Sequence, residues 1–227
     1  MAAPLLVFDF DGVLVDGMVE YWWSACGAGR RLRPEVSLPD QAPAGFSALR
    51  PLIHKGWEMV LAALELSRPD LDLAAYLADY DGCTRAALAR WQLQPDALQQ
   101  SLEQLRHNAI AQDPSAWRAL HQPYPGVPER LQRLAAEGSD WLVLTTKGGA
   151  FARELLAGYG LQPRAVFGHE QGSKPEVLLQ LSADQGGAAV VYRRPPPHPG
   201  NRAPNPGAGG GALFPGELGL PRPRRRR

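Results

Sequence analysis

Apolar and polar residues follow two different rhythms along this chain. Leu5 to Asp9 is a short apolar run closed by the Asp11-Gly12 pair, which predicts a buried strand running into a tight loop. Later segments instead place apolar residues at helical spacing, at 46–66, 71–80, 84–93 and 95–110. We therefore expect an all-helical segment over residues 17–123.

The ends of these helices are predicted from their polar residues. Asp70, Thr84 and Asp96 are the expected helix starts, because their side-chain oxygens can accept hydrogen bonds from the first free backbone N–H groups. Prolines at positions 34, 39 and 43 predict a loop before the first of the four helices.

Strand and helix signals alternate after the turn at residues 123–126. Strands are predicted at 141–144 and 165–167, and helices at 127–137, 150–159 and 176–183. Such alternation is typical of a parallel, doubly wound sheet covered by helices on both faces. The expected fold is therefore α/β, with a three-layer core from residues 1–16 and 124–185 and the all-helical segment inserted as a separate cap domain.

The net charge of +1 hides an uneven distribution. Residues 186–227 contain eight arginines and one acidic residue, a formal charge of +7, so the preceding 185 residues carry −6. Nine prolines and nine glycines fill much of the same 42-residue segment, which leaves few apolar side chains to offset the entropy of ordering it. We expect a disordered tail. Its abrupt Pro, Gly, Ala and Arg composition suggests a shifted reading frame near residue 190 in a GC-rich gene.

Composition also excludes several classes of protein. Two cysteines are too few for a disulfide-stapled scaffold, and no apolar run approaches the ~20 residues of a membrane span. The N-terminal apolar stretch has no basic start and makes a poor signal peptide. We expect a cytoplasmic protein without a membrane partner. The basic tail lacks interleaved aromatic residues, so nucleic acid is not the expected partner either.

The candidate chemistry lies where the predicted strands end. Asp9 and Asp11 can divide the roles of nucleophile and general acid/base. Thr145, at the end of the second core strand, can hold a phosphate oxygen with its hydroxyl. Lys174, in a Gly-Ser-Lys-Pro turn, supplies the positive charge that an aspartate needs to approach an anionic phosphate.

These motifs together resemble the haloacid dehalogenase superfamily. Asp9-Phe10-Asp11-Gly12-Val13 resembles its first motif, residues 142–147 its second and Lys174-Pro175 its third. The helical insertion resembles the cap of the phosphoglycolate phosphatase-like branch. The resemblance covers residues 4–185.

The resemblance implies a Mg²⁺-dependent phosphatase that acts on a small phosphate monoester. Asp9 would form an aspartyl-phosphate, and Asp11 would protonate the leaving group and then activate water. Thr145 and Thr146 would bind the phosphoryl group, and Lys174 would steady Asp9 and the phosphate. Mg²⁺ would bind the Asp9 carboxylate and the Asp11 backbone carbonyl.

One motif of the family is missing. Its fourth motif is an acidic pair after the next strand, which completes the metal site. Here the candidate strand 188–192 is followed by Arg193 and Arg194, and Glu217 is the only acidic residue after Asp184. A catalytically inactive remnant that at most binds a phosphorylated ligand is therefore one alternative. A dehalogenase or phosphomutase is another, and nucleic-acid binding through the tail is a third.

Other residues have ordinary explanations beside a functional one. Arg50, next to Pro51, can reach a substrate anion or face solvent. The five histidines show no metal-ligand spacing. We expect five tryptophans to pack in the core of the helical segment rather than line a pocket, namely Trp22, Trp23, Trp57, Trp91 and Trp117.

Overall fold

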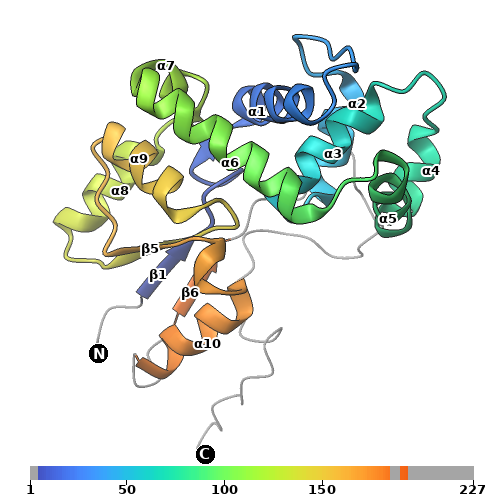
Figure 1. Cartoon of the computed structure of the whole chain (residues 1–227). Coiled ribbons are helices and arrows are strands. Elements are labelled where there is room, and N and C mark those ends of the chain that lie inside the picture. The colour runs from blue at the N-terminus through green and yellow to red at the C-terminus, as the bar shows by residue number, and fades with distance from the viewer. Residues whose placement is uncertain (1–4, 185–189, 194–227) are drawn as a thin grey trace, which may run out of the picture. The chain divides into compact units, whose positions relative to one another are not determined.

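A computed structural model describes residues 5–184 and 190–193. Four strands form one parallel sheet in the order β5-β4-β1-β6 (Figure 1). Their bounds are Leu5–Phe8 (β1), Trp141–Leu144 (β4), Ala165–Phe167 (β5) and Val190–Arg193 (β6). Phe8 pairs with Val143 on one side and with Arg193 on the other, so the carboxyl ends of three strands lie together.

Helices cover both faces of this sheet. Helices α8 (Val127–Ala136) and α9 (Gly149–Gly158) pack on one face, and α10 (Lys174–Asp184) packs on the other. In β1, Leu5 and Val7 contribute to the cluster with α10, whereas Leu6 and Phe8 face α8 and α9. This alternation confirms the predicted three-layer α/β core.

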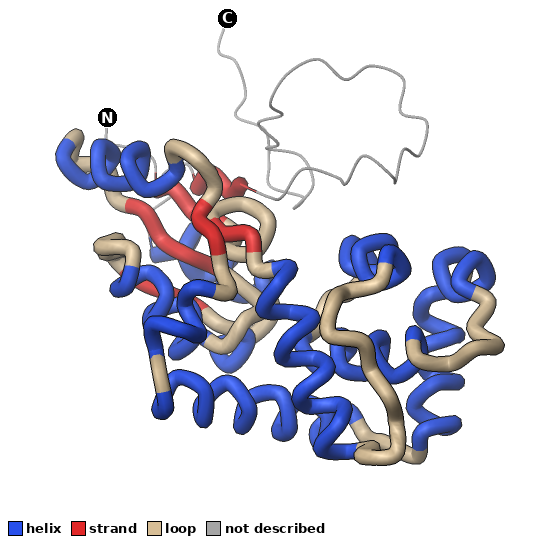
Figure 2. The backbone as a smooth tube through the Cα atoms, turned by 90° about the horizontal axis from the view of Figure 1, so that it is seen from above, coloured by secondary structure: helices blue, strands red, loops and turns tan. Residues whose placement is uncertain are grey.

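The helical segment, residues 18–119, lies between two short antiparallel strands, β2 (Val15–Asp16) and β3 (Gln122–Pro123). Figure 2 shows its helices gathered to one side of the strands. The helices are α1 (Met18–Leu32), α2 (Ala44–Leu49), η1 (Arg50–Leu52), α3 (Gly56–Leu66), α4 (Leu73–Ala78), α5 (Tyr80–Trp91), α6 (Pro95–Gln112) and α7 (Pro114–Ala119). Helices α1, α3 and α6 enclose a core of its own, including Phe46, Leu61 and Leu98.

The segment predicted as one helix at 46–66 is broken. Pro51 has no N–H to donate to a carbonyl of the preceding turn, so α2 ends and passes into the single 3-10 turn η1. Ile53 and Lys55 are extended before α3 begins at Gly56. The break places His54 and Lys55 beside the pocket described below.

Helix α1 has no counterpart in the sequence prediction. Its centre holds Gly27 and Gly29, which lower helix propensity. A Cβ on Gly27 would lie 2.6 Å from Leu105 Cδ2, the end of a side chain of α6, so the two helices approach closely at this glycine.

The helix starts also differ from the prediction. Asp72 and Asp79 accept the backbone hydrogen bonds that cap α4 and α5, whereas Thr84 lies inside α5. The start near Asp96 is Pro95, with Asp96 in the first turn of α6. A side chain two to five residues away can therefore take the capping role from the one that the pattern favours.

Within the described residues, no helix has the length and apolar character needed to cross a membrane. The tail predicted at 186–227 lies outside the described residues except for β6, which occupies most of the strand expected at 188–192.

Candidate active site

Asp9 and Lys174 are brought together from opposite ends of the core. Asp9 directly follows β1 and is only 8% exposed. Its Oδ1 accepts a hydrogen bond from the Phe10 N–H at 2.8 Å, and its Oδ2 accepts one from Lys174 Nζ at 2.6 Å. These two residues are 165 positions apart, and their pairing is the contact that the motifs predict.

The start of α10 explains how Lys174 reaches Asp9. The Ser173 N–H donates to Glu176 Oε2 at 2.8 Å, and the Glu176 N–H donates to Ser173 Oγ at 3.5 Å. This reciprocal capping box fixes the first turn of α10. Lys174 stands in that turn, at the carboxyl edge of the sheet.

A tight turn after β1 presents Asp11. Gly12 has a φ of +79°, a conformation that residues with a Cβ rarely adopt. Its N–H donates to the Val15 carbonyl at 2.9 Å, while the side chain of Phe10 is fully buried beneath the turn. The turn therefore holds Asp11 two residues from Asp9 but in a different environment.

The turn after β4 carries three consecutive polar residues. Thr145 is 2% exposed, and its Oγ1 accepts a hydrogen bond from the Lys147 N–H at 3.0 Å. Lys147 points back to Asp11, with 3.6 Å between Nζ and Oδ1. Thr146 is exposed and lines the neighbouring pocket.

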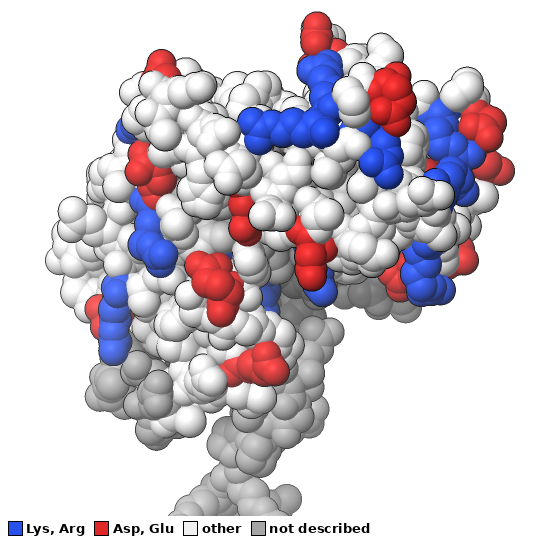
Figure 3. Space-filling view, in the orientation of Figure 1, with Lys and Arg blue, Asp and Glu red and all other residues white. Residues whose placement is uncertain are grey.

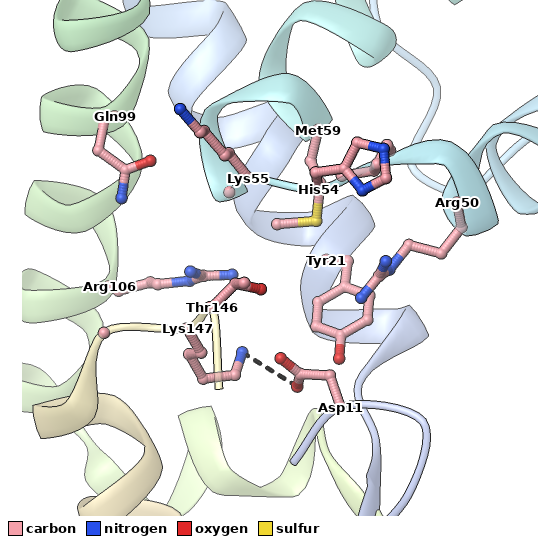
Figure 4. A pocket seen from close by; sticks show the side chains of 13 residues that line it. Asp11, Tyr21, Arg50, His54, Lys55, Met59, Gln99, Arg106, Thr146 and Lys147 are labelled. Atoms are coloured by element: carbon pink, nitrogen blue, oxygen red, sulfur yellow. Dashed lines mark ion pairs between the residues drawn. The ribbon is translucent and has the colours of Figure 1, made fainter. Parts of the chain in front are cut away.

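A small pocket opens beside Asp11 and Lys147 (Figure 4). The helical segment supplies most of its wall, and the turns after β1 and β4 supply the rest. Basic residues outnumber acidic ones among its lining residues, which include Arg50, Lys55, Arg106, Lys147 and Asp11. The site can therefore accept an anionic or strongly polar ligand.

Three of the lining residues carry a buried polar atom that lacks a hydrogen-bond partner in the described part of the chain. These atoms are Asp11 Oδ1, the Tyr21 hydroxyl oxygen and Arg50 Nε. Figure 4 shows the Tyr21 hydroxyl pointing toward Asp11, with the Arg50 guanidinium beside the ring. Asp11 Oδ1 is ion-paired with Lys147 Nζ at 3.6 Å, so the Tyr21 hydroxyl and Arg50 Nε are the buried polar atoms that a ligand in this pocket would satisfy.

The two carboxyl groups are shifted in opposite directions. Burial raises the pKa of Asp9, and the Lys174 ammonium only partly offsets this. Burial also acts to raise the pKa of Asp11, but Lys147 and Arg50 outweigh it and hold that pKa below its usual value. Two neighbouring aspartates with unlike environments can take unlike roles in a reaction.

The magnesium site implied by the resemblance is incomplete among the described residues. Asp9 offers its carboxylate and Asp11 its backbone carbonyl, but residues 5–184 and 190–193 contain no group of three His, Cys, Asp or Glu side chains placed to hold a metal ion. The family's acidic pair would follow β6, whose last residue, Arg193, is basic. These donors do not by themselves fit a resident divalent cation.

Sequence reasoning missed several residues of the site. The sequence offered one signal for Lys147, which is the third consecutive polar residue after the strand β4. Tyr21, Glu20 and Arg106 lie on helices and carried no motif signal. His121, to which no role was assigned, is buried with its Nε2 3.6 Å from Glu20.

Other expectations are settled by burial. Arg50 is half-buried and lines the pocket, so it does not simply face solvent. Trp22 and Trp117 are buried, and Trp57 and Trp91 pack against the helical core. Trp117 packs with the sheet-side cluster instead, and Trp23 is exposed.

Charges of both signs are interspersed on the face shown in Figure 3. Basic and acidic side chains alternate there over the helical segment rather than forming one basic block.

The fold recurs in solved structures. A predicted phosphoglycolate phosphatase from Haemophilus somnus matches with a TM-score of 0.53 and 19% identity, covering 84% of this chain and 76% of its own. A predicted phosphatase from Clostridium acetobutylicum matches with a TM-score of 0.52 and 14% identity, over 85% and 76% of the two chains. A haloacid dehalogenase-like hydrolase from Bacteroides fragilis gives 0.52 and 16%, over 84% and 78%.

No family model matches this sequence, and no curated protein matches it. The structural matches and the sheet order nevertheless agree with the fold predicted from the motifs. The chain has the fold of the haloacid dehalogenase-like phosphatases, an α/β core with a helical segment inserted after its first strand.

Proposed function

We propose that this chain hydrolyses a small phosphate monoester through a phosphorylated Asp9. The observation that carries the proposal is the 2.6 Å contact between Lys174 Nζ and Asp9 Oδ2 at the carboxyl edge of a parallel sheet. Ligands of such folds lie at this edge. A lysine beside the carboxylate can draw an anionic phosphate within reach of it.

In the first step, an Asp9 carboxylate oxygen forms a bond to phosphorus and the ester P–O bond breaks. The electron pair of that bond goes to the ester oxygen, which takes a proton from the Asp11 carboxyl group and leaves as an alcohol. Thr145 and Lys174 hold the phosphoryl oxygens.

In the second step, the Asp11 carboxylate takes a proton from water and the resulting hydroxide attacks phosphorus. The bond between Asp9 and phosphorus breaks, which releases inorganic phosphate and restores both aspartates. Lys147 and Arg50 hold the pKa of Asp11 below its usual value in the free chain, so its role as the acid requires the bound anionic phosphate to raise that pKa.

The helical segment acts in this proposal as a cap that excludes bulk water and selects the leaving group. Arg50, His54 and Lys55 of the segment and Thr146 and Lys147 of the core line one pocket, which supports that role. A closed pocket strengthens electrostatic interactions with the substrate.

Magnesium and a cytoplasmic location belong to the proposal only through the resemblance. Because the described donors do not complete a metal site, no step is assigned to the cation. Its effect is instead a variable in the experiment.

The test is turnover of 4-nitrophenyl phosphate by the purified chain, with and without Mg²⁺, beside Asp9→Asn and Asp11→Asn. We expect turnover that Asp9→Asn abolishes and Asp11→Asn lowers by about 10²–10⁴-fold, the range for a lost general acid/base. Equal turnover by the folded wild type and Asp9→Asn would overturn the proposal.

The incomplete donor set favours a second candidate, an inactive phosphate-binding protein. It requires that wild type and Asp9→Asn share the same background rate. It also requires that inorganic phosphate still binds, which isothermal titration calorimetry measures, and that Lys174→Met abolishes this binding.

A further inference from the structure

A buried ion pair joins two helices behind the pocket. Glu20 of α1 is completely buried, and Arg106 of α6 is 3% exposed. Arg106 Nε donates to Glu20 Oε1 at 2.7 Å, and its Nη2 donates to Oε2 at 2.8 Å. This bidentate geometry is the strongest that the two side chains can make.

The Glu20–Arg106 pair is not explained by protein stability alone. Burying two charges costs several kcal/mol, and well-packed apolar residues often give equal or greater stability. The proposed mechanism gives neither residue a role. We therefore examine what the Glu20–Arg106 pair does for the neighbouring pocket.

Glu20 also faces Lys147. The Lys147 ammonium lies 3.8 Å from Glu20 Oε2 and 3.6 Å from Asp11 Oδ1, so it is held between two carboxylates. Its side chain is 2% exposed, and the ring of Tyr21 lies 5.0 Å from Nζ. Lys147 has little freedom to take another position.

The pocket places the Lys147 ammonium on the leaving-group side of the phosphoryl group. Asp11 and Lys147 line the pocket, but Asp9, Thr145 and Lys174 do not. If the phosphoryl group lies on those three residues, the group that extends into the pocket past Asp11 is the leaving alcohol. Figure 4 shows the Lys147 ammonium beside Asp11 at that point.

We propose that Lys147 is a further catalytic residue that binds the departing ester oxygen, and that Glu20, paired with Arg106, is the positioning residue that fixes its ammonium there. This inference rests on the proposed function. Glu20 neutralises the repulsion that Arg106 would otherwise exert on Lys147, and it draws the ammonium to one place.

The step stays balanced with Lys147 included. A Lys147 N–H donates a hydrogen bond to the ester oxygen as its bond to phosphorus breaks, and the proton that completes the alcohol still comes from Asp11. Lys147 transfers no proton. Its contribution grows with the negative charge on the leaving oxygen, so it matters most for poor leaving groups.

The experiment compares two substrates. Phenyl phosphate releases a poor leaving group, and 4-nitrophenyl phosphate releases a good one. The variants are Lys147→Met, Lys147→Arg and Glu20→Gln, and kcat/KM is measured because it reports the step that breaks the ester bond. Glu65→Gln is the matched control. Glu65 is 1% exposed and pairs with Arg90 and Arg68 in the helical segment, yet it does not line the pocket.

For Lys147→Met we expect kcat/KM to fall about 100-fold on phenyl phosphate and much less on 4-nitrophenyl phosphate, in the range for loss of one oxyanion donor. For Glu20→Gln we expect kcat/KM to fall about 10-fold on phenyl phosphate and less on 4-nitrophenyl phosphate. Lys147→Arg should retain part of the activity on phenyl phosphate that Lys147→Met loses. Glu65→Gln should lose comparable stability, yet keep the wild-type ratio between the two substrates.

Equal loss on both substrates for Glu20→Gln and Lys147→Met would overturn this inference. It would leave the proposed function intact if wild type still turned over and Asp9→Asn did not. A folded wild type that hydrolyses neither substrate would overturn the proposed function and this inference with it.

Discussion

Glu20 and Lys147 show how much of this site depends on residues that no local pattern marks. Glu20 meets Arg106 across 86 positions, and only the packing of α1 against α6 brings them together. Asp9, Asp11 and Lys174 could be identified because each stands in a short motif at a strand end or turn. A buried partner on a helix face has no such mark.

At this scale, stability should depend on pH through Glu20. Burial acts to raise the pKa of Glu20, but Arg106 and Lys147 outweigh it and hold that pKa well below its ordinary value of 4.5. A carboxyl group whose pKa is lowered on folding stabilises the protein above its ordinary pKa, and this contribution is lost as the pH falls through the folded value.

We therefore expect Glu20→Gln to lower the free energy of unfolding by about 3–5 kcal/mol at pH 7, since it leaves Arg106 buried without its partner. The difference from wild type should narrow below about pH 4.5, where the wild-type contribution fades. Urea unfolding at several pH values measures this. A difference that stays constant down to about pH 3 would contradict the pairing.

At the scale of elements, the strands were easier to predict than the helices. The apolar runs at 141–144 and 165–167 coincide with β4 and β5, because buried parallel strands need continuous apolar sequence. Helix α1 was missed because its glycines serve contacts with residues distant in sequence. The broken helix at 46–66 shows that apolar spacing persists through a proline that ends the helix.

Gly168 is a position where close packing of two backbone segments constrains the turn after β4. A Cβ there would lie 2.2 Å from the Gly149 backbone nitrogen, which begins α9 directly after the turn that carries Thr145 and Lys147. We expect Gly168→Ala to lower the free energy of unfolding by about 1–3 kcal/mol, the usual cost of overpacking. Turnover should fall as well, because the turn must move.

Gly27→Ala is the matched control for this prediction. Its new Cβ would meet only the tip of the flexible Leu105 side chain, and alanine restores helix propensity at the centre of α1. Thermal unfolding and turnover compare the two variants. Equal and negligible effects would show that the approach of Gly168 to Gly149 does not constrain the site.

At the scale of the whole molecule, charge is divided between an acidic body and a basic C-terminal segment. Residues 198–227 hold six arginines and one glutamate. Such a segment can bind nucleic acid only through its charge, and this binding weakens steeply as salt rises.

We expect the full chain to bind duplex DNA only at low salt, and a chain ending at residue 197 to lose this binding while keeping its turnover. Fluorescence anisotropy across a salt series, with 4-nitrophenyl phosphate turnover alongside, measures both. Tight binding at physiological salt, or loss of turnover on truncation, would give the tail a functional role.

The central claim is that Asp9 becomes phosphorylated. The most direct test mixes Asp11→Asn, in which the second step is slowed, with 4-nitrophenyl phosphate, quenches it in acid and maps the added phosphoryl group by mass spectrometry. The account predicts one HPO₃ group on Asp9 and none in an Asp9→Asn/Asp11→Asn double variant. The account would be contradicted if the wild type turned over but quenched Asp11→Asn carried no phosphoryl group on Asp9. A phosphoryl group on another residue would contradict it as well.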